Sequence, residues 1–328
     1  MVIRRCEKMR QTKFDFVGRR KTFFAITLAI ILIGLIFNVI FGTQLDIKFT
    51  GGAIASYSYE GTIDAESVQN VAEESTGAQI TSVQVNQDVE IAGTDAKVST
   101  VSLSFSGNNA LSLEQHKAMT DALQENFPDN NIQQGESDSV DATMGRDFLL
   151  KCLVAVALAS ILMVIYVAFR FKKMGWSAGI MALVALLIDV TNVYFTFVIF
   201  RLPIDDNFIA VALTILGYSL NDTIIIYDRI REMRKGMSPK TDLGDVVNAS
   251  INQNLGRTIN TSLCTFMAVA CVFVISLVFN LDSVTAFALP MMVGIVSGCY
   301  TSTCLVGPLW VMWKRHHSKA KAAKKARA

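Results

Sequence analysis

Six long apolar runs constrain this 328-residue chain more than any other feature of its sequence. A helix needs about 20 consecutive apolar residues to cross the hydrocarbon core of a bilayer, and each run reaches that length. The chain is 52% hydrophobic and only 18% charged, which indicates a membrane protein with one soluble insert and not a soluble enzyme. We predict a polytopic α-helical membrane protein with six transmembrane helices, at residues 22–42, 148–169, 176–200, 208–227, 258–279 and 287–313.

The segment at 43–147, between the first two runs, has a different composition. It holds 17 Asp and Glu residues against four Lys and Arg residues, and it contains no catalytic constellation, which favours a binding or lever role. Alternating stretches and stretches of helical period follow one another in the order βαββαβ, as in a split βαβ, ferredoxin-like motif. We predict an α+β domain with strands at 54–59, 79–88, 97–105 and 131–135, and with helices at 64–75 and 112–127.

The Lys and Arg residues outside this domain gather in short segments beside the apolar runs. By the positive-inside rule these segments are cytoplasmic. We therefore expect the chain to cross the cytoplasmic membrane with both termini inside and the acidic domain outside. Ser238 and Pro239 are typical of a helix start, and the amphipathic segment after them is expected on the inner membrane surface or against the bundle. The predicted layout is a cytoplasmic basic N-terminus (1–21), transmembrane helix 1 (22–42), an extracytoplasmic α+β domain (43–147), transmembrane helices 2–6 with a cytoplasmic amphipathic segment at 238–256 (148–313), and a basic cytoplasmic tail (314–328).

Asp222 is a carboxylate inside the fourth apolar run. A charge at the centre of a bilayer costs about 2.5–3.5 kcal/mol even on insertion scales, so such a group normally faces a bundle interior or a polar path. One interpretation is that Asp222 gains and loses a proton during function. The other is a structural carboxyl that burial keeps neutral, or one that is bonded to a neighbouring helix.

Other polar groups lie in the same apolar surroundings. Arg257 opens the fifth run, where it either reaches the inner surface or serves as a counter-charge to Asp222. Asp189 is open to two interpretations, as a structural hydrogen-bond partner or as part of a polar path. The small residues of the sixth run favour close helix packing. The candidate polar path comprises Asp189, Asn192, Asn221, Tyr218 and Thr261.

No cofactor or metal site is predicted. The six Cys and three His residues have no metal-ligand spacing, and the chain has no Gly-rich nucleotide loop and no pattern of nucleophile and base. The basic clusters are better explained by membrane topology and anionic membrane lipid than by nucleic acid. An enzyme is therefore not expected.

The block Gly-Tyr-Ser-Leu-Asn-Asp-Thr at 217–223, followed by Asp-Arg-Ile-Arg-Glu at 228–232, resembles a signature of the SecD/SecF family of preprotein translocase subunits, within the resistance-nodulation-division superfamily. Phe-Thr-Gly-Gly at 49–52 and Arg-Thr at 257–258 add to the resemblance, which extends over about residues 14–313. It implies a SecF-type subunit that acts with SecD and the SecYEG channel on a translocating preprotein, driven by the proton motive force. By position, Asp222 matches the proton-handling aspartate of the family and Arg257 its associated arginine.

The chain departs from the family pattern at three places. Lys48 stands where an aspartate is usual, residues 140–142 read Val-Asp-Ala where the family has Val-Gly-Pro, and Met233 replaces an asparagine. Two alternatives to the translocase function are a stand-alone proton-coupled small-molecule exporter and a non-conducting scaffold subunit. Exporters of this fold usually carry twelve spans and two large outer domains, so six spans and one domain argue against the first alternative.

Overall fold

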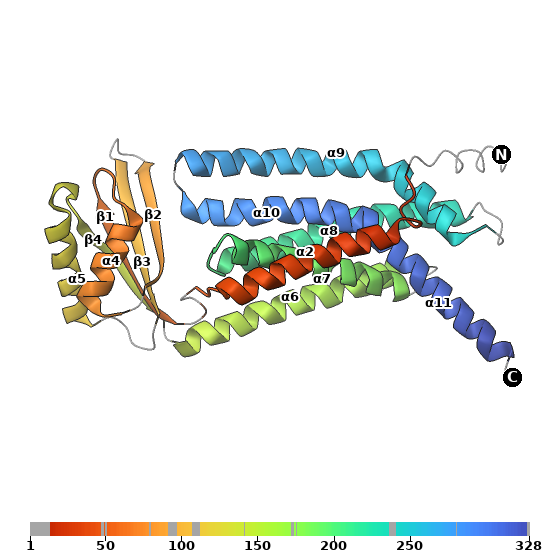
Figure 1. Cartoon of the computed structure of the whole chain (residues 1–328), viewed down its shortest axis with the longest axis horizontal. Coiled ribbons are helices and arrows are strands. Elements are labelled where there is room, and N and C mark those ends of the chain that lie inside the picture. The colour runs from red at the N-terminus through yellow and green to blue at the C-terminus, as the bar shows by residue number, and fades with distance from the viewer. Residues whose placement is uncertain are drawn as a thin grey trace.

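A computed structural model shows a bundle of long helices with an α+β domain at one end (Figure 1). Within the part of the chain that the structure describes, six helical segments are long and apolar enough to cross a membrane, in agreement with the predicted number of spans. The start of the first span and the whole of the last helix lie at the end of the bundle that is remote from the α+β domain. The structure describes residues 14–46, 49, 51–78, 80–90, 97–106, 112–140, 142–171, 174, 176–235, 241–279 and 281–326.

The helices of the bundle extend beyond the apolar runs, because a helix can continue into water once its polar residues reach the membrane surface. The last span is interrupted by a π-helical turn, η2 (Thr301–Val306), after which the chain leaves the bundle obliquely (Figure 1). The helices are α2 (Arg20–Phe41), α6 (Ala142–Arg170), α7 (Trp176–Ile199), α8 (Asp206–Lys235), α9 (Leu243–Val278), α10 (Asp282–Tyr300) and α11 (Gly307–Ala326).

The predicted amphipathic segment and the fifth span form one continuous helix, α9. Asp242 caps its start by accepting a hydrogen bond from the backbone N–H of Gly244 at 3.2 Å, whereas the predicted start at Ser238 lies outside the described residues. The apolar side of its first turns, at Val246 and Val247, packs into the main core of the bundle. The segment was expected either on the inner membrane surface or against the bundle, and in the structure it packs against the bundle.

The bundle has a closely packed centre and an outside rich in exposed apolar side chains. Within the chain, 50% of the apolar stretch of α7, of α8 and of the last span is buried, against 11% for α2, α6 and α9. In the central core, the Tyr227 hydroxyl donates to the carbonyl of Ala178 at 3.0 Å, and Trp310 Nε1 donates to Ser177 Oγ at 3.2 Å. The buried carboxylates of the bundle also lie on α7 and α8.

Helix α2 packs on α7 through Gly34, which gives a testable expectation. A Cβ atom at Gly34 would lie 2.2 Å from the ring carbons of Phe195, so Gly34→Ala must separate the two helices. We expect a loss of about 1–3 kcal/mol of stability, read as a lower unfolding temperature in detergent. Gly217→Ala is the matched control, because nothing lies within 4 Å of a Cβ there. Equal unfolding temperatures for the two variants would show that this contact does not hold α2.

The α+β domain follows α2 and has the predicted element order. Its four strands form an antiparallel sheet in the order β2-β3-β1-β4, and the last strand is longer than the stretch at 131–135 indicated. The two helices of the domain and the sheet share one hydrophobic core, which includes Tyr57, Leu103, Val68 and Leu123. The elements are β1 (Gly52–Tyr59), α4 (Ala65–Thr76), β2 (Ile80–Glu90), β3 (Lys97–Ser106), α5 (Leu113–Asn126), a short 3₁₀ turn (Pro128–Asn130) and β4 (Gln133–Val140).

The chain between α2 and the domain is bound to the loop between α7 and α8. The Asp46 N–H donates to the Ile204 carbonyl at 3.0 Å, and the Ile204 N–H donates to the Gln44 carbonyl at 2.8 Å. In the same loop, Asp205 accepts a hydrogen bond from the backbone N–H of Asn207 at 2.9 Å at the start of α8. Burial, and to a smaller extent the negative charge of Asp46, raise the pKa of Asp205 above its usual value of 3.8.

The raised pKa predicts how pH affects this joint. Folded Asp205 holds its proton to a higher pH than the unfolded chain does, so its stabilising contribution is full below about pH 4 and is lost as pH rises through the folded pKa. Asp205→Asn should stabilise the protein at pH 7 by about 0.5–1 kcal/mol, because the amide keeps the cap and removes the charge. The gain in unfolding temperature should disappear at pH 4. A variant that is less stable than the parent protein at pH 7 would contradict this account.

Candidate functional site

Asp222 lies on the buried side of α8, at mid-length, and is 1% exposed. Its Oδ2 atom has no hydrogen-bond partner within the protein. A buried carboxylate oxygen without a donor is costly, and such groups in native structures call for a functional or solvent explanation. The buried, unpartnered carboxyl distinguishes Asp222 from the acidic residues at the ends of the spans.

Arg257, the predicted counter-charge, lies on α9, the neighbour of α8. It exerts an electrostatic attraction on Asp222, but no ion pair or hydrogen bond joins the two among the described residues. Arg257 instead lines an open cavity at the end of the bundle. The structure therefore places the two charges in range of each other without contact, an arrangement that a change in protonation can readily alter.

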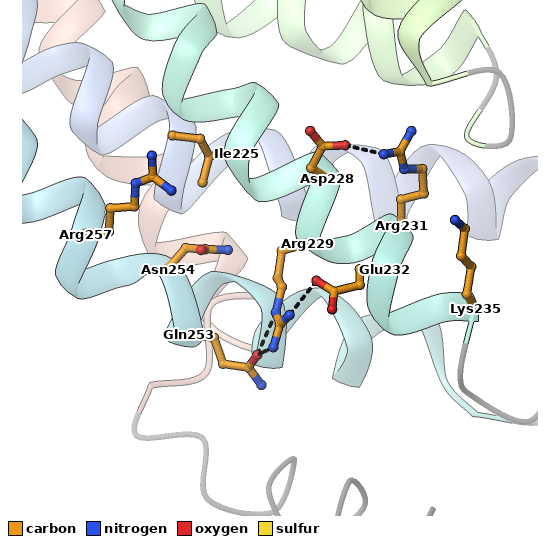
Figure 2. Close-up of a pocket in the computed structure, with 9 residues that line it drawn as sticks. All are labelled: Ile225, Asp228, Arg229, Arg231, Glu232, Lys235, Gln253, Asn254 and Arg257. Atoms are coloured by element: carbon orange, nitrogen blue, oxygen red, sulfur yellow. Dashed lines mark hydrogen bonds and ion pairs between the residues drawn. The ribbon is translucent and has the colours of Figure 1, made fainter.

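The cavity has a volume of about 500 Å³ and is lined by residues of α8 and α9 (Figure 2). It lies toward the ends of these helices that are remote from the α+β domain (Figure 1). Arg231 and Arg170 both pair with Asp228, at 2.8 and 3.0 Å, and Arg229 bonds Glu232 and Gln253. The lining is charged or polar except for Ile225. The full lining is Ile225, Asp228, Arg229, Arg231, Glu232, Lys235, Gln253, Asn254 and Arg257.

Asp189, on α7, is fully buried and has a complete set of hydrogen-bond partners. Ser219 Oγ donates to it at 2.6 Å, Ser297 Oγ at 2.6 Å and Thr301 Oγ1 at 2.9 Å. Asn192 joins the network by donating to Ser297 Oγ at 2.8 Å. Four segments thus meet at one carboxylate, since Ser219 belongs to α8, Ser297 to α10 and Thr301 to η2. These hydrogen bonds join the four segments, as the structural interpretation of Asp189 expects, and the alternative of a polar path stays a prediction.

The other members of the predicted polar path do not converge. Asn221 lies on the exposed side of α8. Thr261 is exposed, and its hydroxyl donates to the carbonyl of Arg257 on its own helix at 2.9 Å. Tyr218 is one turn from Asp222 on α8, and its hydroxyl is buried without a partner. In the structure Asn192 therefore belongs to the hydrogen-bond network of Asp189, and Tyr218 lies one turn from Asp222 on the same helix.

Two residues outside the predicted polar path are buried polar groups of α9, the neighbour of α8. Thr258 and Ser262 of α9 are 1% and 6% exposed, and their hydroxyls have no hydrogen-bond partner. They are four residues apart and so share a helix face, which is the signal that would have separated them from Thr261. Among the described residues no group of three or more His, Cys, Asp or Glu residues could hold a metal ion.

Comparison with known proteins adds to this geometry. Residues 118–316 match the family model described as protein export membrane protein SecD/SecF, C-terminal. The chain belongs to the SecD/SecF family. It is 31% identical to protein translocase subunit SecF from Acidaminococcus fermentans, with 92% of this chain and 98% of the relative covered. It is 34% identical to protein translocase subunit SecDF from Bacillus subtilis, with 95% of this chain and 40% of the relative covered.

Solved structures of SecD/SecF proteins share the fold. The crystal structure of SecDF, a translocon-associated membrane protein from Thermus thermophilus, matches with a TM-score of 0.73 at 29% identity and covers 93% of this chain and 39% of that chain. SecDF in a super-membrane-facing form matches with a TM-score of 0.62 at 28% identity, with 95% and 40% covered. The chain thus spans about 40% of the length of its SecDF relatives and nearly all of a SecF relative.

Proposed function

We propose that this chain is an accessory subunit of the Sec preprotein translocase that, with a SecD partner, uses the proton motive force to promote protein export across the cytoplasmic membrane. Its similarity to SecF over 98% of that relative's length supports the translocase assignment. The single observation that carries the proton coupling is the buried, unpartnered carboxyl of Asp222 within electrostatic range of Arg257. The partners proposed are SecD, the SecYEG channel, the translocating preprotein and membrane lipid.

Protonation of Asp222 would change the forces between α8 and α9. The ionised carboxylate attracts Arg257 across a region of low dielectric constant, and the protonated carboxyl does not. A proton that crosses a potential of 100 mV delivers about 2.3 kcal/mol, which is enough to shift an equilibrium between two helix arrangements of similar energy. In this proposal Asp222 is the proton-accepting group and Arg257 is the group that responds to its charge.

The proposed orientation has both termini in the cytoplasm and a ferredoxin-like domain outside the membrane. The basic residues at the ends of α8 and α9 support it, because they line the cavity remote from the domain. The domain's element order and its strand order β2-β3-β1-β4 support the ferredoxin-like assignment. In this orientation the domain is positioned to act on a preprotein that leaves the channel.

Complementation tests the proposed function. The chain is expressed, with and without its SecD partner, in bacteria depleted of their own SecF, and the export of a secreted reporter is measured before and after an ionophore collapses the proton gradient. We expect restored export that needs both the partner and the gradient. Export that is restored without a SecD partner would support the stand-alone exporter alternative. Export that is insensitive to the ionophore would support a scaffold.

A further inference from the structure

Threonine and serine hydroxyls in the helices of this bundle usually donate to the carbonyl four residues earlier. On α9, Thr261 donates to Arg257 at 2.9 Å and Thr265 donates to Thr261 at 3.0 Å. Thr258 and Ser262, on another face of the same helix, make no such bond and are buried without a hydrogen-bond partner. Two hydroxyls that are both desolvated and free to bond are unusual, because each lost hydrogen bond destabilises the fold.

The register of the two helices places these hydroxyls beside Asp222. A hydrogen bond of 2.8 Å joins Arg229 of α8 to Gln253 of α9. The helices are antiparallel and both rise about 1.5 Å per residue, so Asp222, seven residues before Arg229, lies level with position 260 of α9. Thr258 is therefore two residues before that level on α9, and Ser262 is two residues after it. Cys299 of α10 confirms the proximity, since it interacts with both Ser262 and Asp222.

Three buried polar atoms without an oxygen or nitrogen partner thus lie in the seam between α8 and α9: Asp222 Oδ2, Thr258 Oγ1 and Ser262 Oγ. The hydroxyl of Tyr218, one turn from Asp222 on α8, is also buried without a partner. A thiol is only a weak donor, so Cys299 does not satisfy Ser262 as an oxygen or nitrogen would. Buried waters typically make two to four hydrogen bonds to polar groups of this kind. The seam therefore has the donors and acceptors that ordered water needs.

The seam is next to the cavity of Figure 2, because Arg257, the neighbour of Thr258 on α9, lines that cavity. Ile225 lines that cavity and lies three residues from Asp222 on α8, about 4.5 Å along the helix axis. Hydrogen-bonded oxygens are about 2.8 Å apart, so one or two waters span that distance. Arg257 lines the same cavity, and no other charged residue is known to interact with Asp222 among those described.

We propose that Thr258 and Ser262 hold a short chain of water molecules that carries protons between the charged cavity and Asp222; this inference rests on the proposed function. A proton moves from the Asp222 carboxyl to the adjacent water, each water passes one proton to the next, and one proton leaves into the cavity. The reverse sequence protonates the carboxylate, and no other bond changes. The positive charge of Arg257 disfavours an excess proton on the nearby waters, whereas an ionised Asp222 attracts one, so the direction of transfer depends on the charge state of Asp222.

The test removes the two hydroxyls with little change in volume, in Thr258→Val combined with Ser262→Ala. Proton flux is measured with a pH-sensitive dye in membrane vesicles that contain the chain and its SecD partner. We expect the flux to fall by about tenfold or more, the factor that corresponds to the loss of one or two hydrogen bonds along the path. The matched control, Thr261→Val combined with Thr265→Val, removes hydroxyls that bond their own helix and should keep the flux of the parent protein.

A second pair of variants separates the water path from folding and from the proposed function. Thr258→Ser combined with Ser262→Thr restores both hydroxyls and should restore the flux, while the unfolding temperature in detergent checks that every variant is folded. Unchanged flux in the Val/Ala variant, together with lost flux in Asp222→Asn, would overturn the water path and leave the proposed function intact. Unchanged flux in Asp222→Asn would overturn the proposed function itself.

Discussion

Asp222→Asn is expected to abolish the part of protein export that depends on the proton gradient. Asparagine is nearly the same size as aspartate, so the packing of α8 should remain, but the side chain can neither bind a proton nor attract Arg257. Removing a group that transfers protons typically costs 10²–10⁴-fold in the step it serves, so the loss should be at least about a hundredfold for a step limited by proton transfer. Gradient-dependent export of a reporter in SecF-depleted cells is the measurement.

Two controls make the Asp222 result specific. Asp228→Asn removes a carboxylate from the same helix that is paired with Arg170 and Arg231 at the water boundary, and it should leave most of the gradient-dependent export. Asp222→Glu keeps a titratable group and should keep part of the activity. The coupling role of Asp222 is wrong if the Asn variant rescues export as well as the parent chain does.

Asp189→Ala is expected to destabilise the bundle more than any substitution at the α2–α7 contact or at the Asp205 joint. The carboxylate of Asp189 accepts hydrogen bonds from Ser219, Ser297 and Thr301, and all four side chains are buried. Without it the hydroxyls of Ser219 and Ser297 lose their acceptor, that of Thr301 keeps only the carbonyl of Gly298, and a cavity remains, which should lower the stability by about 3–5 kcal/mol. The unfolding temperature of the purified protein in detergent measures this effect.

Asp189→Asn separates the loss of hydrogen bonds from the loss of charge. The amide oxygen still accepts, and a Ser or Thr hydroxyl can rotate to accept from the new NH₂ group, so we expect a loss of only about 1–2 kcal/mol. If both variants unfold at the temperature of the parent protein, the network does not hold α7, α8 and α10 together. Equal, large losses in both would instead show that the negative charge is essential to the fold.

The six spans and the element order of the α+β domain could be predicted because each depends on local patterns. An apolar run of sufficient length forms a helix whatever its neighbours are, since lipid leaves the backbone no other partner. The ends of helices were harder to place. The apolar pattern stops at 227, yet α8 continues to Lys235, because a charged segment in water can remain helical and no residue of that segment breaks it.

The candidate site could be predicted only in part, for a geometric reason. Asp222 was identified because a carboxylate in an apolar run is conspicuous by itself. On α9 the polar residues surround the helix, and only the position of α8 decides that Thr258 and Ser262 face inward while Thr261 faces outward. The partners of Asp189 come from three other segments. The sequence of one segment does not determine how far it is shifted along the bundle relative to the others, so these contacts could not be predicted.

The π-helical turn at Thr301–Val306 fixes which side of α11 meets the bundle. Such a turn accommodates one residue more than an α-helical turn, so everything after it is rotated by about 100° relative to an uninterrupted helix. Thr301 can thereby reach Asp189 while Trp310, 0% exposed, donates to Ser177. Deleting one residue from this turn would rotate the indole of Trp310 out of the bundle and leave a cavity beside Tyr227.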